Sequence, residues 1–237
     1  EQVSRLLAYA HENRIPVTPR GAGTNLVGST VPLDGGIILD LSHMNRILEL
    51  DRDTMTVTVE PGILLQELQR YVEERGLFYP PDPGDKESSI GGNISTNAGG
   101  MRAVKYGVTR DYVRGLEVVL ADGTVLQAGG KCVKDASGLS LKNLFVGSEG
   151  TLAVITKCIL KLIPKPETSV SVLVPYADLE KGITSVLAIL QAGADPTAVE
   201  FIQRKVVALG ERYSGVQYPC PEAGSFILLT FDGHASQ

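Results

Sequence analysis

The amino-acid sequence predicts an α+β fold, built from two successive modules. Apolar and polar residues alternate in RILELD (46–51) and TMTVTVE (54–60), a pattern typical of half-buried strands. Apolar residues at helical spacing run through ILLQELQRYVEERG (63–76), which ends at a glycine and is typical of an amphipathic helix. A new series of strands and helices begins after Pro164. The sequence therefore predicts a first module over 1–164 and a second over 165–237.

The other elements follow from the same criteria. A turn at Asp122-Gly123, between two apolar runs, predicts a β-hairpin over 116–130. In the first module we further expect a helix over 1–14, strands over 15–19 and 36–41, and a long strand within 148–164. In the second module we expect a strand over 168–176, a helix over 178–193 and strands over 197–202 and 225–233.

Composition narrows the class of protein. Apolar residues make up 43% of the 237, enough for a real core, and the net charge of −5 disfavours a nucleic-acid partner. The three cysteines form no C-x-x-C pair, which argues against a disulfide framework or a zinc knuckle and favours a reducing compartment. No apolar run reaches the length of a membrane span. We expect a cytoplasmic protein, with peripheral membrane attachment through a partner as the alternative.

A glycine-rich loop, PRGAGTNLVGS (19–29), follows the strand predicted near residue 17. It is not the dinucleotide fingerprint G-x-G-x-x-G, because position 26 is leucine and no helical pattern follows. A phosphate-binding P-loop motif is also absent from the sequence. Consecutive backbone amides can still form a concave anion site, and glycine removes the Cβ that would block the ligand. The loop therefore predicts a phosphate site of another kind.

A second glycine segment, SSIGGNISTNAGG (88–100), lies in a stretch from 79 to 107 that we predict to be irregular. Its glycines, Gly91 and Gly92 included, are expected to offer free amides, and its Ser, Thr and Asn residues offer hydrogen-bonding side chains. Two such segments, with GSEG (147–150) as a third, suit a diphosphate held from two sides. The alternative is that they are flexible surface loops.

Four separated motifs carry a family resemblance: PRGAGTNLVG, PPDPGDKESSIGGNISTNAGG, YGVTRDYVRGLEVVLADG and LFVGSEGTLAVIT. Their order and spacing resemble the FAD-binding PCMH-type domain of the vanillyl-alcohol-oxidase superfamily. Within it the chain is most similar to the D-2-hydroxyacid dehydrogenase branch, which includes the glycolate oxidase D-subunit and D-lactate dehydrogenases. The resemblance implies a two-subdomain FAD-binding domain (1–60 and 61–164), with an incomplete N-terminus, and then the start of a ferredoxin-like cap over 165–237.

The resemblance also implies which residues contact FAD. Around the pyrophosphate we expect Arg20, Gly21, Ala22, Gly23, Thr24, Asn25, Gly28 and Ser29. Along the pyrophosphate, the ribityl chain and the flavin ring we expect Pro83, Gly84, Ser89, Ile90, Gly92, Asn93, Thr96, Asn97, Gly99 and Gly100, with Tyr106 and Gly107 nearby. At the adenosine end we expect Glu149, Gly150 and Ile155.

The histidines bear on how FAD is held. Some members of the superfamily bond the flavin to a histidine of the first glycine loop, where this chain has Thr24. His11, His43 and His234 all lie outside the glycine segments. We therefore expect FAD to be bound non-covalently.

The sequence offers no catalytic residue or metal site of its own. It contains no H-x-x-x-H or H-E-x-x-H pattern, and Arg110, Arg114 and Glu200 fit surface or sheet roles better than catalytic ones. In the resembled dehydrogenases the base and the metal ligands come from later histidine motifs. We therefore expect catalytic residues beyond Gln237.

The resemblance implies an FAD-dependent dehydrogenase that oxidises a 2-hydroxy acid of the lactate or glycolate class to the 2-oxo acid, by hydride transfer to flavin N5. A small hydroxy acid would be the substrate, and an electron-transfer flavoprotein or an iron–sulfur subunit would accept the electrons. Two alternatives remain open: an NADPH-dependent flavin reductase of the same fold, and an FAD-binding electron-carrier module without hydroxy-acid chemistry.

Overall fold

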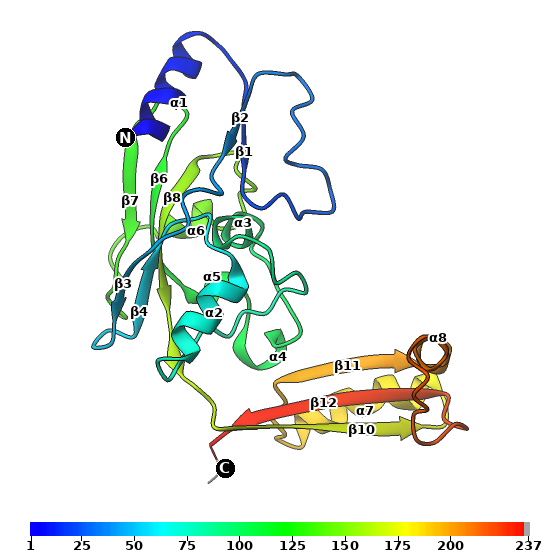
Figure 1. Ribbon diagram of the computed structural model, residues 1–237. Coiled ribbons are helices and arrows are strands. Elements are labelled where there is room, and N and C mark those ends of the chain that lie inside the picture. Colours follow the sequence, from blue (N-terminus) through cyan, green and yellow to red (C-terminus); the bar gives the residue numbers. More distant parts are fainter. Residues whose placement is uncertain (235–237) are drawn as a thin grey trace. The chain divides into compact units, whose positions relative to one another are not determined.

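The computed structural model describes residues 1–234, and the chain in it divides into two compact units (Figure 1). The first unit comprises Glu1–Gly100 and Val108–Lys165, and the second comprises Met101–Gly107 and Pro166–Gln237. The mixture of helices and strands confirms the α+β class. The short segment Met101–Gly107 interrupts the first unit, and no sequence pattern indicated that it belongs with the second.

A five-stranded antiparallel sheet forms the centre of the first unit. Its strands lie in the order β3 (Ile47–Asp51), β4 (Thr56–Val59), β8 (Val154–Lys161), β6 (Val113–Val119) and β7 (Val125–Gly129). All five were predicted, and β4 is buried along its whole length. Strands from both sides of Glu60 share this sheet, so the expected subdomain boundary at residue 60 does not separate two sheets.

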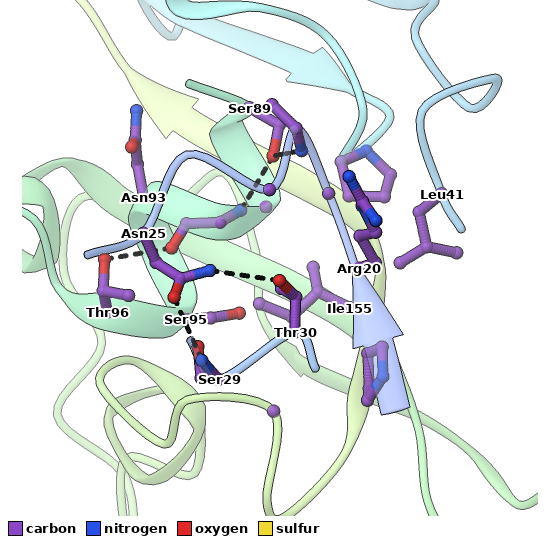
Figure 2. Close-up of a pocket in the computed structure, with 18 of the residues that line it drawn as sticks. Arg20, Asn25, Ser29, Thr30, Leu41, Ser89, Asn93, Ser95, Thr96 and Ile155 are labelled. Atoms are coloured by element: carbon purple, nitrogen blue, oxygen red, sulfur yellow. Dashed lines mark hydrogen bonds between the residues drawn. The ribbon is translucent and has the colours of Figure 1, made fainter. Parts of the chain in front are cut away.

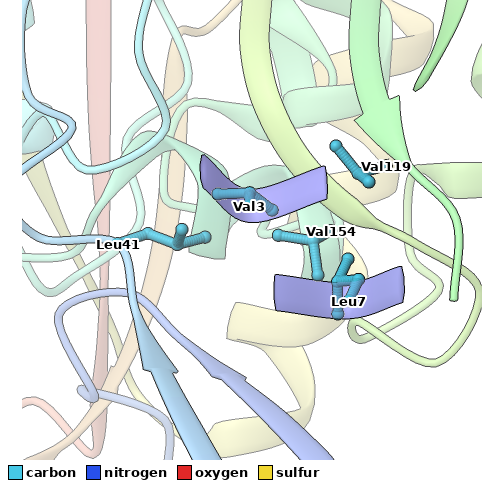
Figure 3. Packing of buried hydrophobic residues seen from close by; sticks show 5 residues of the cluster. All are labelled: Val3, Leu7, Leu41, Val119 and Val154. Atoms are coloured by element: carbon cyan, nitrogen blue, oxygen red, sulfur yellow. The ribbon is translucent and has the colours of Figure 1, made fainter. Parts of the chain in front are cut away.

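Two parallel strands, β1 (Val17–Arg20) and β2 (Ile37–Asp40), form a separate small sheet in the first unit. Parallel strands need a long crossover, and here the crossover contains the first glycine loop and no helix. Helix α1 (Gln2–Glu12) packs its apolar face into a small core (Figure 3). That core consists of Val3, Leu7, Leu41, Val119 and Val154.

Helix α2 (Leu65–Glu73) buries Leu65, Leu68 and Val72, as its pattern predicts. Short pieces complete the first unit, and several of them were not predicted. They are β5 (Leu77–Phe78) paired with β9 (Ile163–Pro164), and the helices α3 (Ile90–Thr96), α5 (Thr109–Tyr112) and α6 (Lys142–Phe145).

The second unit has a three-stranded antiparallel sheet in the order β10 (Thr168–Tyr176), β12 (Ser225–Gly233), β11 (Ala198–Gln203). Helix α7 (Leu179–Gln191) packs against all three strands, and α8 (Arg204–Ser214), which was not predicted, packs against β11. The short helix α4 (Ala103–Tyr106) also contacts β11. Within residues 1–234, no helix is both long and apolar enough to cross a membrane.

Candidate functional site

A cleft in the first unit gathers the three glycine segments at the carboxyl end of β1 (Figure 2). The space between its walls is about 930 Å³, a figure that includes open solvent at the mouth of the cleft. Its walls are formed by Pro19, Arg20, Gly21, Ala22, Gly23, Thr24, Asn25, Ser29, Thr30, Leu41, Pro61, Ser88, Ser89, Gly91, Gly92, Asn93, Ser95, Thr96, Glu149, Gly150, Ala153, Val154 and Ile155.

Most of the residues expected to contact FAD line this cleft. They are Arg20, Gly21, Ala22, Gly23, Thr24, Asn25, Ser29, Ser89, Gly92, Asn93, Thr96, Glu149, Gly150 and Ile155. The others lie outside its walls: Gly28, Pro83, Gly84, Ile90, Asn97, Gly99, Gly100, Tyr106 and Gly107. Ile90 is fully buried at the start of α3, and Tyr106 and Gly107 belong to the second unit.

Several wall residues were not among the expected FAD contacts. Ser88, Gly91 and Ser95 lie in the second glycine segment, which was itself a visible signal. Leu41 and Pro61 follow β2 and β4, and only the tertiary structure brings them to the cleft.

The first glycine loop presents backbone amides that no protein group uses. Among the described residues, the amides of Gly21, Gly23 and Thr24 donate to no protein acceptor. Gly23 has a φ of 73°, and a Cβ there would lie 2.9 Å from the Arg20 guanidinium. A Cβ on Gly21 would collide with the Ser89 hydroxyl. The loop therefore requires glycine at both positions, and its free amides fit an anion.

Asn25 holds the loop in shape. Its Oδ1 accepts a hydrogen bond from the Ser29 amide at 3.0 Å, and its Nδ2 donates to Thr30 Oγ1 at 3.4 Å (Figure 2). These local hydrogen bonds fix the conformation of the loop, although no helix follows it. The loop can therefore form one wall of a site without the glycine spacing of the dinucleotide fingerprint.

The second glycine segment is helical over α3 (Ile90–Thr96), which corrects the expectation of an irregular stretch for these residues. Ser89 is the N-cap of α3, and its Oγ accepts from the amides of Gly92 and Ala22, each at 3.3 Å. A Cβ on Gly91 would lie 2.6 Å from Pro61 Cβ, so this glycine permits close packing rather than flexibility. One serine hydroxyl thus caps a helix and joins two glycine segments.

The expectation that Gly91 and Gly92 offer free amides is wrong. The amide of Gly91 donates to Pro61 O at 2.7 Å, and that of Gly92 to the Ser89 hydroxyl. The free donors of the site come instead from the first loop and from the Asn93 side chain. Asn93 is only 5% exposed, and its Nδ2 has no partner in the described part of the chain. A buried donor without an acceptor at a cleft wall fits a bound polar ligand.

The third segment is tied to α3. The Gly147 amide donates to Ile94 O at 3.0 Å and the Glu149 amide to Ser95 O at 2.8 Å. Glu149 has a φ of 52°, a left-handed conformation that is uncommon for a residue with a side chain. Arg110, considered above as a surface charge, donates to Val146 O at 2.9 Å and so supports the same turn.

The chemistry of the walls suits a dinucleotide with a diphosphate. Arg20 and Glu149 are the charged wall residues, and Ile155 supplies an apolar surface. Next to the wall residue Leu41, hydrogen bonds from Ser42 lower the pKa of Asp40, the last residue of β2. No histidine lines the cleft, and residues 1–234 contain no group of His, Cys, Asp and Glu side chains placed to hold a metal ion.

Comparison with protein families decides the assignment. Residues 1–129 match the model for an FAD binding domain, and residues 165–237 match the C-terminal domain of FAD linked oxidases. The chain belongs to the PCMH-type FAD-binding family. FAD is the cofactor of this family, which confirms the cofactor expected from the sequence, and the free amides and the unpaired Asn93 nitrogen fit its polar groups.

Curated relatives are similar over nearly the whole chain. The glycolate oxidase subunit GlcD of Bacillus subtilis is 47% identical over 98% of this chain and 50% of its own length. A D-lactate dehydrogenase of Anaerostipes hadrus is 46% identical over 100% of this chain and 51% of its own length. The chain thus spans about half the length of these relatives.

A solved structure supports the fold. Alkyldihydroxyacetonephosphate synthase superposes with a TM-score of 0.85 over 99% of this chain and 46% of that chain, at 22% identity.

Proposed function

We propose that this protein is an FAD-dependent oxidoreductase that oxidises a short 2-hydroxy acid, D-lactate or glycolate, to the 2-oxo acid. The observation that carries the proposal is the cleft in which the first glycine loop presents unused amides beside the unpaired, buried Asn93 nitrogen. The names of the relatives supply the substrate class, since they include a glycolate oxidase subunit and D-lactate dehydrogenases.

In this proposal the chain's own residues bind and orient the cofactor. The amides of Gly21, Gly23 and Thr24 hold the pyrophosphate, with Arg20 supplying positive charge beside it. Asn93 donates to a polar group of FAD, and Ile155 contacts an apolar part of it. When bound, FAD supplies an acceptor for the hydride that leaves the substrate Cα.

Non-covalent binding of FAD is part of the proposal. Thr24 occupies the loop position where a flavin-linking histidine would stand, and a threonine hydroxyl forms no such link. Acid precipitation of the yellow protein should release all flavin into the supernatant. Yellow colour retained in the washed pellet would contradict this.

We further propose that a protein accepts the electrons, either an electron-transfer flavoprotein or an iron–sulfur subunit. The measurement is the rate at which substrate-reduced flavin is reoxidised, with each candidate acceptor and with oxygen alone. Faster reoxidation by oxygen alone than by either acceptor would refute this part.

The substrate is tested on the full-length flavoprotein under anaerobic conditions. D-lactate, L-lactate, glycolate and NADPH are added to separate samples while the flavin absorption band is recorded. We expect bleaching by D-lactate or glycolate and none by L-lactate or NADPH. Bleaching by NADPH alone would indicate a reductase, and no bleaching by any 2-hydroxy acid would refute the dehydrogenase. Full-length protein that takes up no FAD would refute the flavin site itself.

A further inference from the structure

The turn at 147–150 forms part of the cleft wall in a conformation that is unfavourable by itself. Gly147, Glu149 and Gly150 all lie in the left-handed region, with φ of 83°, 52° and 76°. Glu149 has a side chain, so this conformation raises its energy and persists only when surrounding contacts hold it. Glu149 and Gly150 line the cleft. The shape of this wall therefore depends on the residues that hold the turn.

Arg110, in α5, lies where α3 and α6 both end. Its backbone amide donates to Asn97 Oδ1 at 2.9 Å, and Asn97 is the C-cap of α3. Its guanidinium donates from Nη1 to Asn143 O at 3.2 Å and from Nη2 to Val146 O at 2.9 Å. Both carbonyls lie at the end of α6, where the last carbonyls of a helix have no partner inside it. One residue thus joins the ends of two helices.

Gly147 lets the guanidinium lie directly against the turn. A Cβ at this position would lie 3.3 Å from Arg110 Nη2 and 3.5 Å from Asn97 Cβ. The acceptor next to it, Val146, is only 2% exposed. A hydrogen bond from a charged donor is stronger than one between neutral groups, and partial burial limits competition from water. The turn and the guanidinium are therefore closely fitted.

The contacts of Arg110 lead to both sides of one part of the cleft. Asn97, which accepts from its amide, follows the wall residue Thr96. Val146, which accepts from its guanidinium, opens the turn that contains the wall residue Glu149. Arg110 is not itself a wall residue, and all of these residues belong to the first unit.

We propose that Arg110 is a positioning residue for the cofactor: it holds the turn at 147–150 against the end of α3 before FAD binds. The inference rests on the flavin site proposed above. A wall that is already ordered loses less conformational entropy when the ligand binds. Without the guanidinium the turn can leave its left-handed conformation, and FAD then has to restore it, which lowers the affinity.

Arg114 offers a matched control, because it has the same charge and lies four residues further along the chain. Its Nη1 donates to Val133 O at 3.3 Å, through an exposed hydrogen bond away from the cleft walls. Replacement of either arginine by methionine removes one positive charge and keeps a long side chain. The comparison therefore separates the loss of the Arg110 hydrogen bonds from the loss of a charge.

FAD-free, full-length protein is titrated with FAD and separately with ADP, which has the diphosphate and adenosine but no flavin. We expect Arg110→Met to raise both Kd values by about tenfold, because the wall is no longer pre-organised. Arg114→Met should change them by less than about twofold, because its hydrogen bond is exposed to water. Arg110→Lys keeps the charge but not the forked donors, and should raise the FAD Kd by about fivefold.

Hydrogen exchange of the FAD-free protein distinguishes local positioning from a general loss of stability. The amides of Gly147 and Glu149 donate to carbonyls of α3. We expect both amides to exchange faster in Arg110→Met, while the amides of β6 and β8 keep their wild-type rates. If Arg110→Met does not fold, Arg110→Lys is used for the same measurement.

Three results would overturn the inference. The first is an FAD Kd equal to that of wild type in folded Arg110→Met. The second is an equal loss of affinity in Arg110→Met and Arg114→Met with full affinity in Arg110→Lys, which would show that only the charge matters. The third is faster exchange throughout the first unit. Wild-type protein that takes up no FAD would instead refute the proposed flavin site, and this inference with it.

Discussion

At the scale of single residues, Asn93 is the most informative wall residue of the cleft. Its amide nitrogen is buried and has no acceptor among residues 1–234. A buried donor left unpaired costs about 1–3 kcal/mol. The unpaired donor therefore lowers the stability of the FAD-free protein, and a bound acceptor removes that free-energy cost. Asn93 thus strengthens FAD binding at the expense of the stability of the FAD-free protein.

Replacing Asn93 by leucine, which has a similar shape, should separate these two effects. We expect the FAD Kd to rise by about tenfold, because a donor to the ligand is lost. The free energy of unfolding without FAD should stay the same or increase, because the unpaired donor is gone. Isothermal titration with FAD and urea unfolding of the FAD-free protein check the two parts. Equal FAD affinity in the variant would contradict the role given to Asn93.

A wall residue was predictable from the sequence where neighbouring residues in the chain determine its conformation, and was not where tertiary contacts bring it to the cleft. Gly23 and Asn25 were predictable because their conformation and hydrogen bonds depend on neighbours in sequence, whereas the residue that excludes a Cβ at Gly21 is Ser89 of the second glycine segment. Leu41 and Pro61 were not, because they reach the cleft only through the pairing of β1 with β2 and the packing of Gly91 against Pro61.

At the scale of secondary structure, α3 shows why a glycine-rich sequence can be helical. Gly91 and Gly92 have low helix propensity, so the sequence favoured a loop. Contact with Pro61 leaves no room for a Cβ at Gly91, and Ser89 supplies the N-cap. The helix depends on tertiary contacts, and a prediction from intrinsic helix propensities takes no account of them.

Ser89→Ala should destabilise the protein by about 1 kcal/mol through loss of the cap, and it should also weaken FAD binding. Asp178 is the matched control, because it caps α7 in the second unit by accepting from the Lys181 amide at 2.9 Å. Asp178→Ala should cost a similar stability and leave the FAD Kd unchanged. Urea unfolding and FAD titration of both variants provide the measurement. An equal loss of FAD affinity in Ser89→Ala and Asp178→Ala would argue against a local role for Ser89.

The ends of β3 and β4 are joined by an ion pair that makes stability depend on pH. Glu60 accepts from the Arg46 amide, Nε and Nη2 at 2.9, 3.1 and 2.8 Å. These hydrogen bonds lower the pKa of the Glu60 carboxyl. The unfolded state therefore binds more protons in acid, so the stabilisation is complete above the unfolded pKa and is lost as pH falls through the folded pKa.

Glu60→Gln should remove this contribution. The difference in unfolding free energy between wild type and Glu60→Gln should be constant near neutral pH and shrink between about pH 5 and 3. Urea unfolding at a series of pH values measures it, and Glu87→Gln, at an exposed carboxylate, should show no such change. A difference that is independent of pH would refute the assignment.

At the scale of the whole molecule, each unit has a core of its own. Val3, Leu7 and Val154 belong to a cluster of the first unit, and Val207 and Phe226 to one of the second. The sequence predicted a second module from residue 165. It could not indicate the membership of Met101–Gly107, because that depends on a buried partner, Asp232, far away along the chain.

Separate cores predict separate unfolding events. We expect scanning calorimetry to resolve two transitions. FAD should raise mainly the midpoint temperature of the transition that belongs to the first unit. At a free FAD concentration of a hundred times Kd, binding increases the free energy of unfolding by about 2.7 kcal/mol. A single transition whose calorimetric and van't Hoff enthalpies agree would show instead that the chain unfolds as one unit.

The hydrogen bond from Lys105 of α4 to Asp232 also limits how this protein can be recombined with its relatives. A chimaera joined only at residue 165 would keep Lys105 from one parent and receive the residue opposite it from the other. A foreign second unit without a carboxylate there would leave the partly buried Lys105 ammonium without its nearest counter-charge. The exchangeable unit is therefore two pieces of sequence, and a working graft has to carry both Met101–Gly107 and the chain after Lys165 from the same parent.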